Sequence, residues 1–213
     1  MNRLNHQQDY WNTAVGKTFT HPLRLDLLAP LISGDARILE FGCGYGRLVR
    51  ELTDAGYPQV IGVDIAPALI AKGRELHPDL DLRLLDTDRL PFADGAFAAC
   101  LLFAVLNCIP GDAGQRALIA ELHRVLGPGG ILYLSDYPLQ RDQRNRDRYA
   151  QYQERYGRYG VFETTDGGVM RHHDRAWLDT LLHDFELLQE LPFEVRTMNG
   201  NPAAALQLLL RKR

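Results

Sequence analysis

The 213-residue sequence lacks long apolar segments and has no strong excess of either charge. No apolar run approaches the ~20 residues that a helix needs to cross a bilayer. Residues 1–6 lack the apolar stretch of a secretion signal. The formal net charge is -3 and the isoelectric point is about 6.2, which argues against a general nucleic-acid-binding protein. We therefore expect no membrane span and no nucleic-acid partner.

Cysteine is also scarce, with three residues and no spacing typical of a metal site. We expect no metal ion. An odd number of cysteines without a secretion signal predicts reduced thiols and a cytoplasmic location. The chain is 46% hydrophobic and 24% charged, the balance of a soluble domain, and its length suits one domain. None of these properties predicts an oligomeric state.

The most informative pattern lies at residues 38–46, ILEFGCGYG, where an apolar strand leads into Glu40 and three glycines at every second position. Glycines at this spacing let the backbone turn tightly and approach a ligand. The helix expected from Arg47 offers free N–H groups at its start. The dinucleotide motif G-x-G-x-x-G needs a glycine at position 47, and no G-x-x-x-x-G-K-[ST] loop occurs. The pattern indicates a site for a polar, nucleotide-like molecule.

A second strand is expected at residues 59–65, QVIGVDI, which carries an acid near its end. Asp64 lies 18 residues after Gly46, close to the spacing that places a carboxylate at the ribose in nucleotide-binding βαβ units. Hydrogen bonds from ribose hydroxyls to a carboxylate are worth roughly 1.5–3 kcal/mol each. A solvated strand-end aspartate is the alternative, which the neighbouring glycine loop disfavours.

The acid followed by G-x-G-x-G resembles motif I of the class I S-adenosylmethionine-dependent methyltransferases, of the small-molecule, methyltransferase type 11-like kind. The D-x-x-x-L-P-F turn at 86–92 and the Pro-Gly-Gly turn at 128–130 are similar to further parts of that family, over about residues 36–137. The resemblance implies an α/β, doubly wound, seven-stranded sheet, mostly parallel with an antiparallel last strand, and helices on both faces. It also implies the cofactor S-adenosyl-L-methionine and the product S-adenosyl-L-homocysteine.

By this resemblance, the cofactor binds at the loops that follow the first four strands. The residues implied are Glu40, Gly42, Cys43, Gly44, Gly46, Asp64, Ile65, Asp86, Thr87, Leu102 and Phe103. Asp86 would meet the adenine amino group and the backbone of Thr87 the ring nitrogen, while Leu102 and Phe103 would face the methionine part. Many family members have histidines where this chain has Asn107 and Cys108, which argues against an imidazole role there.

We expect a single methyltransferase domain over residues 1–213. It would comprise an N-terminal helical cover (1–35), a cofactor-binding core (36–137), a candidate lid or acceptor insertion (138–173), and a C-terminal helix with a β-hairpin (174–213). The recurring leucines at 23–31 predict a helix before the first strand. Asp112 with Gln115 predicts a helix capping pair. Strands near 186–196 and 203–211 with a short connection predict an antiparallel hairpin.

The segment 141–160 is rich in arginine and tyrosine. Its four tyrosines, at 149, 152, 156 and 159, recur at intervals of three, four and three residues, which is one face of a helix. They could line an acceptor pocket from a lid, form a basic aromatic surface for RNA, or pack a surface helix on the core. The arginines also allow an acidic acceptor.

Candidate catalytic residues are His172, His173 and Tyr10. Paired histidines suggest a general base, and a structural role is the alternative. Residues 9–12, DYWN, and His21-Pro22 could cover the methyl-donor site, where aromatic rings attract a sulfonium by cation–π interaction. Tyr10 and Trp11 could equally anchor the N-terminus. With Tyr137, Tyr149 and Tyr152, they are the candidate acceptor-binding residues.

We expect methyl transfer to a small-molecule acceptor by in-line displacement. The chain lacks the N-P-P-Y tetrapeptide of adenine and glutamine N-methyltransferases, which disfavours nucleic-acid and protein amide acceptors. Three alternatives stay open: a non-catalytic S-adenosylmethionine-binding protein, an NAD-dependent oxidoreductase and an RNA methyltransferase. The residue at position 47 and the terminal hairpin disfavour the oxidoreductase. The identity of the acceptor and the atom that is methylated are not predicted.

Overall fold

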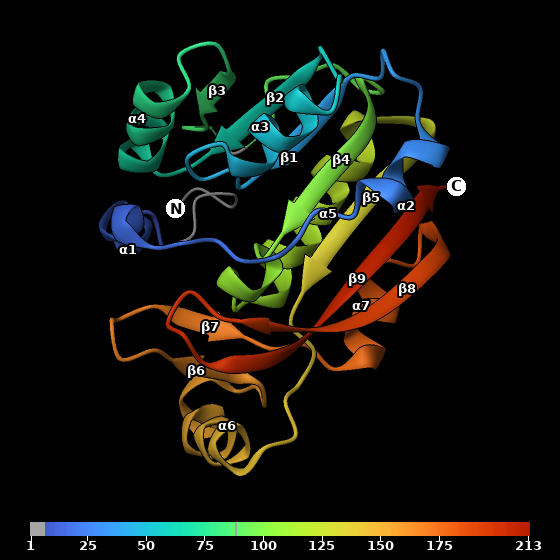
Figure 1. Cartoon of the computed structure of the whole chain (residues 1–213). Coiled ribbons are helices and arrows are strands. Elements are labelled where there is room, and N and C mark those ends of the chain that lie inside the picture. Colours follow the sequence, from blue (N-terminus) through green and yellow to red (C-terminus); the bar gives the residue numbers. More distant parts are fainter. Residues whose placement is uncertain (1–6, 88) are drawn as a thin grey trace.

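The computed structural model describes residues 7–87 and 89–213. Seven strands form one sheet in the order β3-β2-β1-β4-β5-β9-β8 (Figure 1). Its strands are β1 (Ile38–Phe41), β2 (Val60–Asp64), β3 (Asp81–Leu84), β4 (Phe97–Phe103), β5 (Leu126–Asp136), β8 (Phe185–Arg196) and β9 (Pro202–Lys212). The first five are parallel, and β9 runs antiparallel to both β5 and β8. The predicted sheet and its terminal antiparallel hairpin are confirmed.

Helices cover both faces of this sheet. They are α2 (Leu25–Leu28), α3 (Arg47–Asp54), α4 (Pro67–Leu76), α5 (Asp112–Val125) and α7 (Arg175–Leu181). The other helices, α1 (Gln8–Thr13) and α6 (Gln143–Tyr156), lie at the carboxyl ends of the parallel strands, and short 3-10 turns are η1 (Ala14–Gly16), η2 (Ala29–Leu31) and η3 (Leu106–Cys108) (Figure 1). Successive residues of a strand point to opposite faces. In β1, Leu39 packs with apolar residues of α5 and α7, and Ile38 packs with those of α2, α3 and α4. The two hydrophobic cores therefore lie on opposite sides of one buried sheet.

Residues between β5 and α7 form an added layer at the carboxyl ends of the parallel strands (Figure 1). It contains α6 and a two-stranded antiparallel sheet of β6 (Val161–Glu163) and β7 (Val169–Arg171). Asp142 caps α6 by accepting a hydrogen bond from the Asn145 N–H. The helix ends at Gly157, which has a positive φ of 64°. Tyr159 therefore lies beyond the helix, and the expectation that all four tyrosines share one helical face is wrong.

Two further local predictions differ from the structure. The helix expected across the leucines at 23–31 is divided into the four-residue α2 and the turn η2, because Pro30 cannot continue a helical hydrogen-bond ladder. The predicted capping pair at the start of α5 is wrong, since Gly111 is the N-cap and no side chain caps this end. Gln115 is fully buried and serves another purpose, described below. Within the described ranges, no helix is long and apolar enough to cross a membrane.

Candidate active site

A cavity of about 500 Å³ lies between the carboxyl ends of β1, β2 and β4 and the added layer of α6, β6 and β7. Parallel α/β sheets place their ligand sites at this edge. The N-terminal segment runs across the same edge between α1 and α2 (Figure 1) and contributes Trp11, Phe19 and His21. One continuous space therefore joins the glycine loop to the added layer.

The glycine loop has the backbone that its sequence predicts. Gly42, Gly44 and Gly46 have φ values of 76°, 57° and 85°, in the left-handed region that costs side-chain-bearing residues energy. A Cβ on Gly44 would lie 2.4 Å from the ring of Phe19. The loop leads into α3, whose first turn has N–H groups without helical acceptors and carries partial positive charge. This end of the cavity suits an anionic group of a ligand.

Two buried acids lie beside the loop. Asp64 is 8% exposed and accepts hydrogen bonds from the N–H groups of Gly44 (2.8 Å) and Ala66 (2.8 Å), one on each oxygen. Each oxygen keeps a lone pair for a ligand hydroxyl. Burial raises the pKa of Asp64, although the Ala66 and Gly44 N–H groups act in the opposite direction. Burial also raises the pKa of Glu40, which accepts a hydrogen bond from the Val49 N–H.

Nucleotide sugars fit this donor and acceptor arrangement. Asp64 lies in the cavity wall, where paired acceptor oxygens can bind two adjacent ribose hydroxyls. Glu40, Gly42, Cys43, Ile65 and Phe103 line the same wall. The residues present therefore fit an adenosyl cofactor whose sugar lies at Asp64 and whose charged amino-acid end lies toward the loop and α3.

The added layer forms the opposite wall with aromatic and polar side chains. Its cavity-lining residues include Gln140, Arg144, Asn145, Arg148, Tyr152, Phe162, Met170 and His172. The Arg148 guanidinium lies 3.4 Å from the centroid of the Phe162 ring. The turn between β8 and β9 adds Thr197, Met198, Asn199 and Asn201. This half of the cavity is therefore separate from the glycine loop and suited to a second ligand.

Hydrogen bonds determine the tautomer of His172. The Tyr149 hydroxyl accepts hydrogen bonds from the Gln140 N–H (3.2 Å) and from the Arg148 guanidinium, which occupy both of its lone pairs, and it lies 2.5 Å from His172 Nδ1. Its proton can then be donated to Nδ1, which leaves the ring proton on Nε2. Burial, and then Arg148, lowers the pKa of His172 well below the usual value. The ring is neutral, and its Nε2–H is a hydrogen-bond donor in a side chain that lines the cavity.

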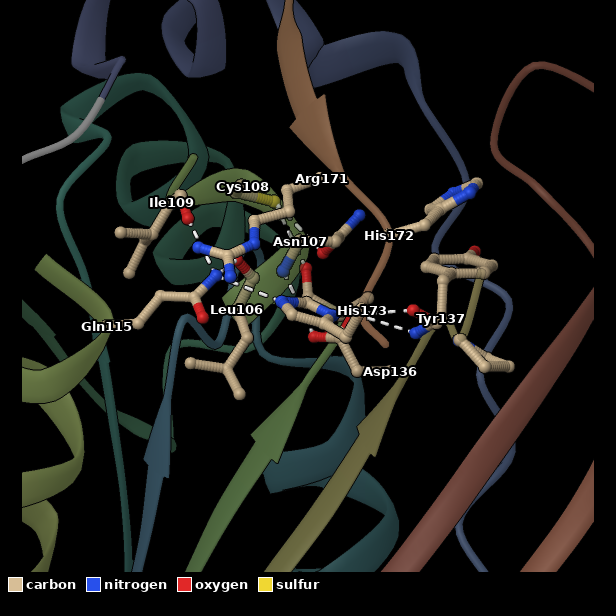
Figure 2. Close-up of polar contacts among 12 residues, drawn as sticks. Leu106, Asn107, Cys108, Ile109, Gln115, Asp136, Tyr137, Arg171, His172 and His173 are labelled. Atoms are coloured by element: carbon tan, nitrogen blue, oxygen red, sulfur yellow. Dashed lines mark hydrogen bonds and ion pairs between the residues drawn. The ribbon is translucent and has the colours of Figure 1, made fainter. Parts of the chain in front are cut away.

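The neighbouring His173 belongs to a different network (Figure 2). Trp177 Nε1 donates to Gln115 Oε1, and Gln115 Nε2, which donates to the Leu106 and Ile109 carbonyls, lies 2.9 Å from His173 Nε2. The carbonyl of Tyr137 faces the other ring nitrogen and can only accept. The His173 proton is therefore on Nδ1, which lies 3.3 Å from the Tyr137 carbonyl and 3.7 Å from Asp136 Oδ1. Burial lowers the pKa of His173 to about 3. His173 is not among the residues that line the cavity.

Several predicted site residues lie away from the cavity. Asp86 and Thr87 are exposed after β3, Leu102 is buried in the core, and Gly44 and Gly46 shape the loop without lining the cavity. Tyr10 donates to Asp166 (3.3 Å) and packs with Trp11, and Tyr149 lies behind His172. Of the other candidates, Trp11, Tyr137, Tyr152 and His172 line the cavity. The roles assigned to all of these residues stay predictions.

Other cavity residues were not singled out from the sequence. Gln140 is held by hydrogen bonds with the backbone of Ala204 in β9. Phe162 and Met170 come from the short β6–β7 pair, and Asn199 from the β8–β9 turn. His21 carries a buried Nε2 without a hydrogen-bond partner among the described residues, and burial lowers its pKa to about 4. Unlike Gln140 and the residues of the strand pair and the turn, His21 was predicted, together with Pro22, to cover the methyl-donor site, and it lines the cavity.

The sheet order β3-β2-β1-β4-β5-β9-β8, with its antiparallel last strands, is that of the class I S-adenosylmethionine-dependent methyltransferase fold. Residues 39–134 match the protein family described as "Methyltransferase domain". Demethylmenaquinone methyltransferase of Beutenbergia cavernae is 35% identical over 102 residues, which are 47% of this chain and 40% of that protein. The eEF1A lysine and N-terminal methyltransferase of Danio rerio is 31% identical over 101 residues, 44% of this chain and 15% of that protein.

A solved structure of a SAM-dependent methyltransferase from Methanosarcina mazei has a TM-score of 0.84 and 24% sequence identity, and covers 90% of this chain and 99% of that one. At this identity the likeness shows the fold alone. Residues 39–134 are therefore similar to the methyltransferase-domain family, and the sheet has the class I S-adenosylmethionine-dependent methyltransferase fold. The chain spans about 40% of the length of the Beutenbergia relative. In the described ranges, no group of three or more His, Cys, Asp or Glu side chains is placed to hold a metal ion.

Proposed function

We propose that this protein transfers a methyl group from S-adenosylmethionine to a small-molecule acceptor. The observation that carries the proposal is the single cavity of about 500 Å³ bounded by the glycine loop and Asp64 on one side and by α6, β6 and β7 on the other. Clefts and cavities of this size are typical of small-molecule sites. The relatives include a demethylmenaquinone methyltransferase and an eEF1A lysine and N-terminal methyltransferase, so the acceptor class is part of the proposal.

The cofactor, when bound, supplies a methyl group on a positively charged sulfur, which an acceptor nucleophile takes by in-line displacement. The chain contributes orientation and exclusion of water. Asp64 would bind the ribose hydroxyls, and Glu40 and the loop would shape the pocket for the amino-acid end. Phe103 and Tyr137 line the cavity between the two walls and would restrict the approach of the acceptor.

His172 is proposed to position the acceptor through its Nε2–H. The hydrogen bond from Tyr149 occupies Nδ1, so a neutral His172 has no free lone pair facing the cavity. A general-base role, as predicted from the paired histidines, is disfavoured by this arrangement. His173, engaged with Gln115 and Tyr137, is proposed to hold β7 against the core. An acceptor that arrives deprotonated, or that loses its proton to water, needs no base from the protein.

The test has two stages. Calorimetry on ligand-free protein should detect binding of S-adenosylmethionine and S-adenosylhomocysteine, and a ligand at 100 times its Kd should stabilise the fold by about 2.7 kcal/mol. An acceptor library then reports turnover as S-adenosylhomocysteine formed. Binding of NAD(H) in place of both compounds would refute the proposal. Cofactor binding without turnover on any acceptor would favour a non-catalytic binding protein. The cytoplasmic location expected from the cysteine count stays a prediction.

A further inference from the structure

We propose that the methyl acceptor is a small organic anion. Its oxyanion group would bind Arg148, with Arg144 beside it. Asn145 would accept a hydrogen bond from a neighbouring O–H or N–H group of the same molecule. Because the site is the acceptor half of the cavity, this proposal rests on the proposed function above.

The first observation is a cation without a counterion. Three arginines line the cavity, and one of them, Arg47, is paired with Glu51 at 2.7 Å. Within residues 7–87 and 89–213, neither Arg144 nor Arg148 forms an ion pair with a carboxylate. Arg148 is half-buried, and its Nε has no solvent contact and no hydrogen-bond partner in those ranges. Arginine stays charged in proteins, and a buried charge needs a partner. An anionic ligand would provide one.

The acids nearest to Arg148 along α6 and β6 are already engaged. Asp142 accepts hydrogen bonds from both the backbone N–H and the side-chain amide of Asn145. Glu163 is paired with Arg155 and accepts a hydrogen bond from the Tyr156 hydroxyl. Neither carboxylate forms an ion pair with Arg148, although Asp142 attracts the guanidinium from a longer distance. The guanidinium is held in place by the face of the Phe162 ring and by a hydrogen bond to the neutral Tyr149 hydroxyl, and neither contact supplies a negative charge.

The second observation is an unpartnered acceptor beside this cation. Asn145 is 4% exposed and lines the cavity. Its Nδ2 donates to Asp142 Oδ2 at 2.5 Å, which fixes the orientation of the amide because a carboxylate can only accept. Oδ1 then is a buried acceptor without a partner among the described residues. Leaving such an atom unsatisfied is unfavourable, and a ligand donor would satisfy it. An acid that also carries a hydroxyl or amino group fits both side chains.

The remaining wall limits the rest of the molecule. Tyr152, Phe162 and Met170 give this end an apolar, partly aromatic lining, and the cofactor shares the same cavity. We therefore expect a compact acceptor with a flat or apolar body. Carboxylates and phosphate monoesters both match the guanidinium, since each accepts two parallel N–H hydrogen bonds from it.

The experiment uses the full chain saturated with S-adenosylhomocysteine. Calorimetry measures the binding of hydroxy- and aminobenzoates, the matched neutral benzamides, and phenyl phosphate. We expect the acids to bind about tenfold or more tightly than their amides, and Arg148→Gln to weaken acid binding by about ten- to a hundredfold. Arg148→Lys should restore part of the loss. Arg146→Gln is the matched control, because Arg146 lies on the same helix, is exposed and does not line the cavity.

The outcomes separate the two proposals. If S-adenosylhomocysteine does not bind, the proposed function fails. If it binds with equal affinity to the parent chain and to Arg148→Gln, the cavity is intact, and any lost acid binding is due to the arginine. Amides that bind as well as acids, or a panel in which no anion binds, would overturn the anionic acceptor. Preference for phenyl phosphate over every benzoate would support the proposal and identify the oxyanion as phosphate.

Discussion

Replacement of Asp136 by asparagine should remove a large part of the pH dependence of stability. Asp136 ends β5 and is 2% exposed. Its two oxygens accept hydrogen bonds from the N–H groups of Tyr137 (2.7 Å) and Asn107 (3.2 Å). No cationic side chain offsets its burial, because the nearby His173 is neutral. Burial therefore raises the pKa of Asp136 to about 7 despite these hydrogen bonds.

The sign and size of the effect follow from linkage. The carboxyl group holds its proton more tightly in the folded state than in the unfolded state, where its pKa is 3.8. Its stabilising contribution is complete below that value and is lost as the pH rises through about 7. A difference of about 3 units corresponds to about 4 kcal/mol of unfolding free energy, of which about 2–3 kcal/mol falls between pH 5 and pH 8.

Urea unfolding at pH 5, 6, 7 and 8 measures this contribution. The difference in unfolding free energy between the parent chain and Asp136→Asn should shrink by about 2–3 kcal/mol from pH 5 to pH 8. The two proteins should also differ in unfolding free energy by an amount that does not depend on pH, because an asparagine amide cannot accept both backbone hydrogen bonds. Asp147→Asn, at an exposed position of α6, controls for loss of an acid. A difference that stays constant with pH would refute the reasoning.

Three further predictions concern the cavity. Asp64→Asn should weaken binding of S-adenosylhomocysteine about ten- to a hundredfold in calorimetry, because one acceptor oxygen for the ribose is lost. Gly44→Ala should lower the unfolding free energy by about 1–3 kcal/mol in urea titrations, since φ is 57° there and Phe19 lies 2.4 Å from the new Cβ. Gly34→Ala is its control, because no atom lies within 4 Å of a Cβ added at that position. His172→Gln, which keeps a donor, should retain kcat/KM within about tenfold, whereas His172→Phe should lose more. The donor role would be contradicted if kcat/KM of the parent chain fell as one histidine became protonated and His172→Gln did not show this fall.

The cofactor half of the site could be predicted because its parts are close in sequence. The glycine loop, the start of α3 and Asp64 belong to one βαβ unit, whose geometry is fixed by short-range packing and by the handedness of the crossover. Their spacing therefore carries information about their positions. The same proximity explains why the hydrogen bond from Gly44 to Asp64 (2.8 Å) forms across two adjacent strand ends.

The acceptor half could be predicted far less well. The sequence of residues 197–201 indicates an ordinary hairpin turn. In the structure this turn reaches the cavity, because the long strands β8 and β9 extend past β5 toward the added layer (Figure 1). The sequence pattern of α6 indicated an aromatic face, but not that Tyr149 would lie behind His172 and fix its tautomer. Such contacts join segments more than 20 residues apart, and no local periodicity specifies them. Gln115 was misread as a cap for the same reason.

Polar contacts around Gln115 connect the added layer to the core of the fold. Its amide donates to the carbonyls of Leu106 and Ile109 at η3, accepts from Trp177 of α7, and lies 2.9 Å from His173, two residues after β7. Close by, the fully buried Arg171 of β7 forms an ion pair with Asp112 at 2.7 Å. Removing one partner of a buried polar pair leaves the other unsatisfied, which costs more than the pair contributes. These polar contacts therefore fix the position of β7 against the core. That position determines where His172, the next residue after Arg171, lies in the cavity wall.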